Sequence, residues 1–448
     1  NTDLYGKMFM IDVNSDIAAG YDQYEALQLG TCTPRTGFLN GKWQNGYNAI
    51  QRANLAIRSI GEAPIDEVPK NQMLGEARFL RALIYFHLLD YFGGLPIYDE
   101  TTDLEKEFNN LLKPRSSAEE TRAFILADLE KALGAGLPDK WNDANYGRVT
   151  LSAAQALLGK VYLYDKQYDK AIENLEKSQA GHALHDDFAE LFTPTGHTSS
   201  EMIFSIINLG GTGNSYGMPL CFYAGTRNSY GSCWNNTVPS TNLVDMYEYK
   251  DGRPFDWDEV FPGFNSDNQV KERVFRCTVN SDGSEVLDIP AESEKVKEMY
   301  EQRDPRLSAT VIAPYTTYLG WNRNQERLMT FIFAKNEKGA VVAVNENNGF
   351  MRNNKGGWET YFWRKFVPEG DWNGQITDRA HTPVNFPILR LADVYLMLAE
   401  CQANLSSDGK SDTYATEALK NLNAVHQRAG LKAITKEDLT DMPLMEWI

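Results

Sequence analysis

The sequence predicts a mainly α-helical protein: antiparallel helix pairs form a tetratricopeptide-like α-α superhelix that carries a large, loop-rich α+β insertion. Two observations support this fold class. Apolar residues recur three and four positions apart, which is the spacing of one helix face, in several long segments. Between them lies a stretch rich in Gly, Asn, Ser, Pro and aromatic residues with only short strand-like runs. The helical segments are 43–60, 71–91, 118–133, 151–164, 168–178, 387–400 and 414–429.

The sharpest local pattern is a helix pair over 151–164 and 168–178, joined by a turn at 165–167. Gly159 and Ala171 are small enough to let two antiparallel helices approach closely, while larger residues fill the groove between neighbouring pairs. Such a pair cannot bury its outer face alone, so the sequence predicts further pairs. The residues at tetratricopeptide offsets are Leu158, Gly159, Tyr162, Tyr168, Ala171 and Leu175.

Other elements can be placed from their boundary residues. The run Ser116-Ser117-x-Glu119-Glu120 is a capping-box-like start for the helix at 118–133. The run 201–208 predicts a strand, and the helix after the insertion is expected to begin at Pro387. A last helix should be capped by Thr440 and Asp441, with Pro443 in its first turn. Further strand-like runs are 275–279, 309–312, 328–334 and 340–344.

These elements divide the chain into two parts. Residues 1–180 and 385–448 are expected to form one helical scaffold, and 181–384 a variable, loop-rich ligand-binding region. The chain begins without a signal peptide and ends inside a helix that has barely started. We therefore expect the natural protein to extend beyond both ends.

Composition limits the possible functions. The 448 residues include 61 acidic and 44 basic ones, a net charge of −17, so nucleic acid is not an expected partner. No apolar run approaches the roughly 20 residues that a membrane helix needs. Five cysteines, an odd number without a C-x-x-C motif, predict unpaired apolar residues. They are Cys32, Cys221, Cys233, Cys277 and Cys401.

Catalytic and metal motifs are weak. The run 213–217 fits G-x-S-x-G around Ser215, but it lacks the strand–turn–helix context of a nucleophile elbow. His182 and His185 have no obvious third metal ligand. The start Asp12-x-Asn14-x-Asp16 resembles a calcium loop without its later Gly and Glu. We therefore predict no catalytic residue, no metal ligand and no cofactor.

The stronger candidates are aromatic residues in polar surroundings. Rings stack on sugar faces, and neighbouring amides, carboxylates and guanidinium groups hydrogen-bond hydroxyls, so such clusters favour carbohydrate binding. The alternative is that these rings pin the loops onto the scaffold. The candidates in the insertion are Tyr223, Tyr230, Trp234, Asn235, Tyr318 and Trp321.

Taken in order, the helical motifs resemble the SusD/RagB family over nearly the whole chain. The run 422–430 departs from the family pattern only slightly, with His426 where Arg is usual. The motifs that carry the resemblance are Trp43-x3-Tyr47-x2-Ile50-x2-Ala53-Asn54, Gly75-Glu76-Ala77-Arg78-Phe79-Leu80-Arg81-Ala82, Asp90-Tyr91-Phe92-Gly93-Gly94-Leu95-Pro96, Pro114-Arg115-Ser116, Gly147-Arg148-Val149-Thr150, Arg303-Asp304-Pro305-Arg306-Leu307 and Pro387-Ile388-Leu389-Arg390-Leu391-Ala392-Asp393-Val394-Tyr395.

The resemblance implies a lipoprotein on the outer-membrane surface of Bacteroidetes, with a SusD-like fold and a lipidated cysteine upstream of Asn1. It implies binding of oligosaccharide or polysaccharide, and a SusC-like TonB-dependent transporter as partner in polysaccharide utilisation. Trp234 matches a ligand-stacking tryptophan, and Trp43 and Tyr47 match structural positions. Asp16, Tyr24 and Arg35 lie in the early region that supplies polar contacts.

The leading hypothesis is thus a non-catalytic, lipid-anchored glycan-binding protein at the cell surface that delivers oligosaccharide to a transporter. A peptide-capturing member of the same family remains an alternative. A glycan-active hydrolase would need a positioned carboxylate pair, or Ser215 with a base.

Overall fold

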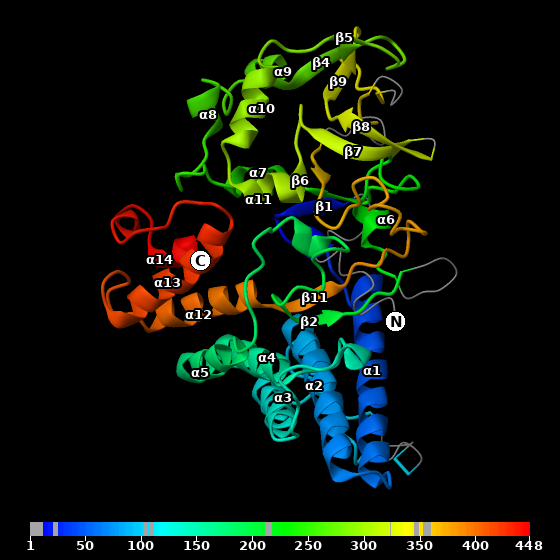
Figure 1. The fold of residues 1–448 in the computed structure, drawn as a ribbon, viewed down its shortest axis with the longest axis vertical. Coiled ribbons are helices and arrows are strands. Elements are labelled where there is room, and N and C mark those ends of the chain that lie inside the picture. The colour runs from blue at the N-terminus through cyan, green and yellow to red at the C-terminus, as the bar shows by residue number, and fades with distance from the viewer. Residues whose placement is uncertain are drawn as a thin grey trace.

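The structure is a computed structural model of the chain, and it shows a helical scaffold beside a second lobe of short helices and strands (Figure 1). The residues that it describes are 12–20, 26–102, 106–107, 112–210, 217–322, 324–344, 349–352 and 360–448.

The scaffold confirms the mainly α-helical fold class. Long helices lie side by side in sequence order, and the second half of the chain adds a further pair against α5 (Figure 1). Ser117 and Glu120 form the expected capping box at the start of α3. The scaffold helices are α1 (Gly37–Glu62), α2 (Glu67–Phe92), α3 (Ala118–Leu133), α4 (Leu151–Tyr164), α5 (Tyr168–Ser178), α12 (Leu391–Leu405) and α13 (Thr413–Arg428).

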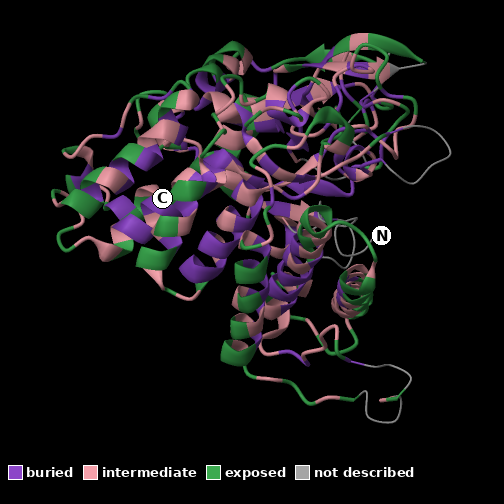
Figure 2. Ribbon diagram, turned by 60° about the horizontal axis from the view of Figure 1, so that its bottom comes forward, coloured by how far each residue is buried: buried purple, intermediate pink, exposed green. Residues whose placement is uncertain are grey.

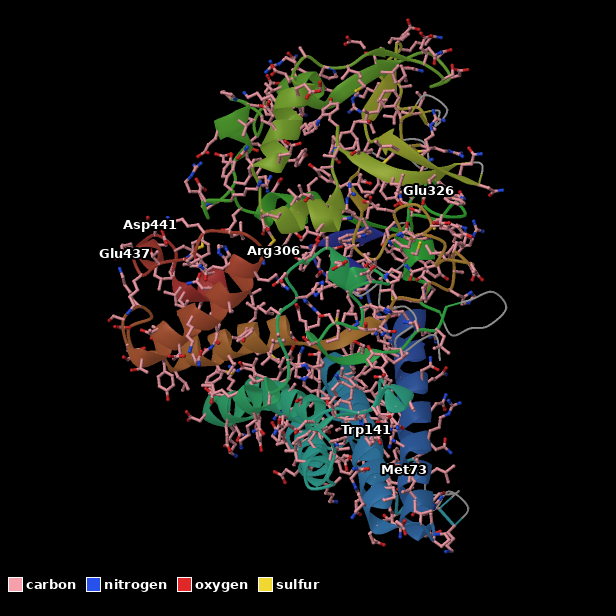
Figure 3. The ribbon with its side chains drawn as sticks, viewed as in Figure 1. Met73, Trp141, Arg306, Glu326, Glu437 and Asp441 are labelled. Carbon is pink, nitrogen blue, oxygen red and sulfur yellow. The ribbon has the colours of Figure 1, made fainter. Side chains whose placement is uncertain are left out.

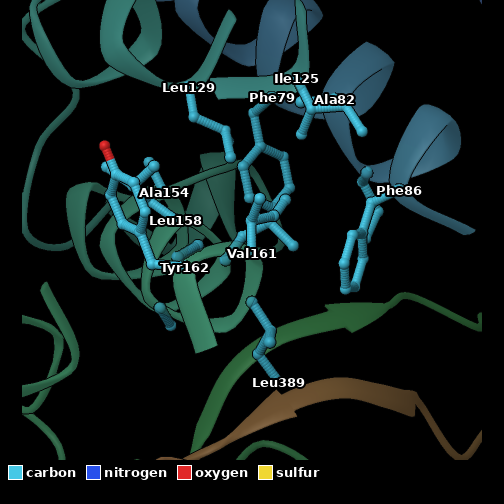
Figure 4. Packing of buried hydrophobic residues seen from close by; sticks show 14 of the residues in the cluster. Phe79, Ala82, Phe86, Ile125, Leu129, Ala154, Leu158, Val161, Tyr162 and Leu389 are labelled. Atoms are coloured by element: carbon cyan, nitrogen blue, oxygen red, sulfur yellow. The ribbon is translucent and has the colours of Figure 1, made fainter. Parts of the chain in front are cut away.

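Apolar faces of these helices meet in one continuous core (Figure 4). Phe79 of α2, Leu129 of α3 and Val161 of α4 are almost completely buried there. The close approach at Gly159 is real, because a Cβ added to it would lie 2.6 Å from Cγ of Leu175. The expected packing role of this glycine is therefore confirmed.

Buried residues form stripes on the inward faces of the helices, and exposed residues lie on the outward faces (Figure 2). One buried stripe contains charge. Arg81 is 1% exposed, and its Nε and Nη2 donate to the carboxylate of Asp128 at 2.7 Å. Nη1 donates to Glu100 at 2.7 Å and to Asn54 at 2.6 Å, so every guanidinium nitrogen is paired.

A two-stranded sheet closes the scaffold where the chain leaves and returns. β2 (Met202–Ile206), within the predicted strand 201–208, pairs antiparallel with β11 (Phe386–Arg390). The expectation that a helix begins at Pro387 is therefore wrong, because these residues extend along β2 and α12 begins only at Leu391. Local periodicity does not show where this helix begins, because the pairing of two distant strands leaves no signal in the nearby sequence.

The second lobe contains two apolar cores of its own, one around Trp257 and Phe261 and one around Tyr318 and Phe331. Its elements are α6 (Leu220–Ala224), β3 (Thr237–Pro239), α7 (Thr241–Met246), α8 (Trp257–Val260), α9 (Asn268–Phe275), β4 (Arg276–Val279), β5 (Val286–Asp288), α10 (Ser293–Glu301), α11 (Pro305–Thr310), β6 (Val311–Ile312), β7 (Thr317–Asn322), β8 (Gln325–Thr330), β9 (Phe333–Asn336) and β10 (Phe362–Trp363).

The strand-like runs have mixed outcomes. The run 275–279 contains β4, and 328–334 covers the end of β8 and the start of β9. The run 309–312 includes the end of α11 as well as β6. The run 340–344 is not a strand, since Val341 forms only an isolated bridge with Lys335.

At both ends of the described chain, the structure differs from the predicted elements. β1 (Ala18–Gly20) pairs with β3, so residues 12–20 pack on the second lobe instead of on the helices. The last helix, α14 (Leu444–Trp447), begins after Pro443, which precedes it instead of lying in its first turn. No helix in the described part of the chain is long and apolar enough to cross a membrane.

Candidate functional site

The candidate site is built on a segment, 220–236, that folds back on itself. It begins in α6 and then turns back, so that the backbone N–H of Trp234 donates to the carbonyl of Phe222 at 2.7 Å. Asn235 N–H donates to Gly225 at 2.9 Å, and Cys233 N–H donates to Thr226 at 3.0 Å. These hydrogen bonds hold the two arms of the segment together and fix the backbone at Trp234.

The first ring group consists of Phe222, Tyr223 and Trp234. The Trp234 ring lies 4.7 Å from the ring of Phe222 and 6.3 Å from that of Tyr223, measured between centroids. Trp234 is nonetheless 46% exposed, although large aromatic residues are usually well buried. Almost half of the surface of Trp234, on an anchored backbone, thus remains open to solvent.

Arg379 completes this group from a distant part of the chain. Its guanidinium carbon lies 5.0 Å from the centre of the Phe222 ring. Its Nη1 donates to the carbonyls of Gly231 and Ser232 at 2.5 Å each. Arg379 therefore holds the turn before Trp234 and presents a cation beside the rings. No sequence motif marks it, because it lies almost 150 positions from this turn.

The second ring group is Tyr230 with Trp321, whose centroids lie 4.9 Å apart. Both side chains are half-buried. Trp321 lies on β7 opposite Glu326 of β8, which Figure 3 labels on this hairpin. The backbone N–H of Trp321 donates to the carbonyl of Asn228 at 2.5 Å and ties the hairpin to the 220–236 segment.

Two predicted contact residues are buried, and their assignment as ligand contacts is corrected here. Tyr318 is fully buried, with its hydroxyl 2.9 Å from that of Ser229 and 2.5 Å from the carbonyl of Pro368. Burial also raises the pKa of this phenol well above its usual value. Asn235 is fully buried in a left-handed conformation with φ of 52°. Both residues support the site from beneath.

The polar candidates near the start of the chain lie in different parts of the molecule. Asp16 is exposed, and its carbonyl accepts a hydrogen bond from Ser240 at 2.5 Å, next to the β1–β3 pair. Because β1 pairs with β3, Asp16 lies near the strand that follows Trp234 in the chain. Arg35 is exposed in the turn before α1, where its backbone N–H donates to the hydroxyl of Thr33 at 3.2 Å. Tyr24 lies outside the described residues.

The two aromatic residues expected in the core have a second role. Trp43 and Tyr47 pack on the scaffold core, as expected, with the Tyr47 hydroxyl donating to Pro96 at 2.9 Å. Their other sides line a cavity of about 510 Å³ together with Asn54, Tyr98 and Leu112.

Groups suited to catalysis or metal binding were sought among the described residues. Within the described residues, no group of three side chains could hold a metal ion. Ser215 lies outside the described residues. His381 and Asp378 form a hydrogen-bonded pair at 2.9 Å close to Gly217. Burial opposes ionisation of Asp378, but hydrogen bonds from His381 and Ala380 outweigh it and lower the pKa of this carboxyl.

Comparison with known proteins assigns the family. A model of the SusD family matches residues 200–448, more than half of the chain. The chain belongs to the SusD family. A second SusD-like model, described as starch-binding associating with outer membrane, matches residues 2–163. A SusD-like protein of Bacteroides ovatus is 24% identical over 438 residues, which cover 94% of this chain and 64% of that protein. The chain spans less than two thirds of the length of the curated relatives it matches.

Solved structures agree on the SusD fold. A SusD-like protein from Bacteroides fragilis superposes with a TM-score of 0.72 at 24% identity, over 99% of this chain and 81% of that one. A laminarin-binding SusD-like protein gives a TM-score of 0.65 at 21% identity, over 98% of this chain and 86% of that one.

Proposed function

We propose that this SusD-family chain is a non-catalytic glycan-binding protein that captures oligosaccharide at the outer-membrane surface and passes it to a SusC-like TonB-dependent transporter. The observation that carries the proposal is the exposed side chain of Trp234 on an anchored backbone, flanked by a second pair of rings. Membership of a family with a laminarin-binding relative supports it. The outer-membrane association in the description of the matched model supports the location, which we propose is reached through an N-terminal lipid anchor.

The binding mode follows from the two ring groups. Trp234 and Tyr223 would stack on apolar sugar faces, with Tyr230 and Trp321 forming a second platform. Arg379 and Asp16 would hydrogen-bond hydroxyls. Each polar contact replaces a contact with water and contributes only about 0.5–1.5 kcal/mol. The resulting affinity is modest, which suits a protein that must release its ligand to a transporter.

The proposal is tested by affinity gel electrophoresis of the chain through a panel of polysaccharides that includes laminarin, xyloglucan, starch and host glycans. We expect retardation in at least one gel, followed by measurable binding of the corresponding oligosaccharides in calorimetry. Unretarded migration through every gel, together with retention of peptides, would instead support peptide capture.

One observation favours a second candidate, a hydrolase: the His381–Asp378 pair has the arrangement that orients a general base. Turnover of glycosides and esters by the wild type, compared with Ser215→Ala and His381→Gln, separates the two functions. The binding proposal expects no turnover above background in any of the three proteins.

A further inference from the structure

Two cysteines meet beneath the first ring group. Cys221 in α6 and Cys233, 12 positions later, place their sulfur atoms 3.6 Å apart. Both side chains are fully buried. A disulfide requires a sulfur–sulfur distance of about 2.05 Å, so small rotations of the two side chains would close the gap.

The backbone brings these positions together without help from the sulfur atoms. The residues that follow the two cysteines, Phe222 and Trp234, are joined by the hydrogen bond of 2.7 Å described above. Gly225 also packs against Cys233, where an added Cβ would lie 2.9 Å from Cβ of Cys233 and 3.0 Å from its Sγ. The fold therefore positions the thiols for bonding and leaves little room for them to separate.

We propose that Cys221 and Cys233 form a disulfide that closes the segment ending directly before Trp234 and so fixes the base of the aromatic site. Both S–H bonds break and one S–S bond forms. The two electrons and two protons pass to the disulfide of a thiol oxidoreductase, or to oxidised glutathione, which leaves as two thiols.

The burial of the pair determines when this step occurs. Thiolate is the attacking species, and burial raises the pKa of the Cys221 thiol well above its usual value. The bond must therefore form while the segment is still open during folding. Once folded, the same burial shields the bond from reductants.

The other cysteines are placed differently. Cys277 and Cys401 are buried, and neither is within hydrogen-bonding distance of another sulfur among the described residues. Cys32 is partly exposed. A disulfide between Cys221 and Cys233 would therefore leave three of the five cysteines as thiols.

The test counts thiols. The full chain is refolded with reduced and oxidised glutathione, and a brief treatment with mild reductant in the native state removes glutathione from the partly exposed Cys32. The protein is then denatured and alkylated with N-ethylmaleimide. Mass spectrometry should find three adducts and a cross-linked peptide pair containing Cys221 and Cys233. Five adducts would overturn the proposal.

Matched variants make the count specific. Cys32→Ser removes a thiol outside the pair and should carry two adducts, whereas Cys233→Ser should carry four. Equal numbers of adducts in the two variants would contradict the pairing. Because the readout is mass, it is independent of glycan binding, and the proposed function can fail without affecting this result.

Discussion

The buried carboxylate of Glu201 accepts a hydrogen bond from Arg428 at 2.7 Å, although 227 positions separate the two residues. The same carboxylate accepts from Arg390 at 2.6 Å and from the backbone N–H of His185 at 2.8 Å. Glu201 precedes β2, Arg390 ends β11 and Arg428 ends α13. One carboxylate therefore joins both edges of the insertion to the last helix pair.

Glu201→Gln should destabilise the fold by about 3–5 kcal/mol, because it leaves the buried guanidinium of Arg428 and the partly buried one of Arg390 without a counter-charge. The measurement is urea unfolding followed by circular dichroism. Glu173→Gln is the matched control, since Glu173 pairs with Lys177 on the surface and its loss should have a much smaller effect. Equal effects would show that the buried cluster contributes no more than a surface pair.

Gly159→Ala should lower the free energy of unfolding by about 1–3 kcal/mol, because the new Cβ overlaps Leu175 where α4 and α5 approach. Gly61→Ala is the control within α1, where an added Cβ has no neighbour within 4 Å. Alanine there should stabilise the helix by up to about 1 kcal/mol. A neutral Gly159→Ala would mean that the helix pair can separate freely.

His87 should make stability depend on pH. Burial, with the positive charges of Lys42 and Lys160, lowers its pKa from 6.5 to about 4. The unfolded chain therefore binds more protons between these values, so this contribution is complete above pH 6.5 and is lost as pH falls towards 4. By pH 5 the loss should be about 1–2 kcal/mol.

The check is the difference in unfolding free energy between pH 7 and pH 5, compared between wild type and His87→Gln. The variant should show a smaller difference. Between pH 7 and pH 8, above both pKa values, the two proteins should instead show the same small difference. An unchanged difference in His87→Gln would show that the pKa of this imidazole is the same in the folded and the unfolded chain.

Trp234→Ala should raise the dissociation constant for the glycan found in the gel panel by at least about tenfold, since a central aromatic contact is lost. Tyr414→Ala removes an exposed ring on α13 and should leave binding unchanged. Melting curves should show that both variants are folded at the temperature of the binding measurement. Wild-type affinity in Trp234→Ala would remove this residue from the site.

Tyr318→Phe distinguishes support from contact. The lost hydroxyl served two buried partners, so stability should fall by about 1–3 kcal/mol. Glycan affinity should stay within about twofold, whereas Trp321→Ala should weaken it clearly. A large loss of affinity in a stably folded Tyr318→Phe would restore Tyr318 as a ligand contact.

Predictions from the sequence succeeded where the determining interactions are local. The periodic segments, the Ser117 capping box and the tetratricopeptide offsets all depend on residues within a few turns, and the structure shows each of them. The proximity of Trp234, Tyr230 and Tyr223 in the chain also allowed them to be grouped as one candidate site, and their contact with a glycan stays a prediction.

Predictions from the sequence failed where the interacting residues lie far apart in the chain. Pro387 to Arg390 look helical alone, but β2 imposes a strand on them from almost 200 positions away. Tyr318 and Asn235 have the composition of a binding surface, yet packing of the lobe places both beneath it. Arg379 carries no motif at all and joins the rings only in the folded chain.

By itself, then, the sequence determined the helical scaffold, its family resemblance and the stretch in which aromatic rings gather in polar surroundings, because short-range periodicity and spacing encode these. Only the tertiary structure decided which rings face solvent, which cation stands beside them and which two cysteines touch. Exposure and contact depend on how segments far apart in the chain cover one another, and no single segment contains that information.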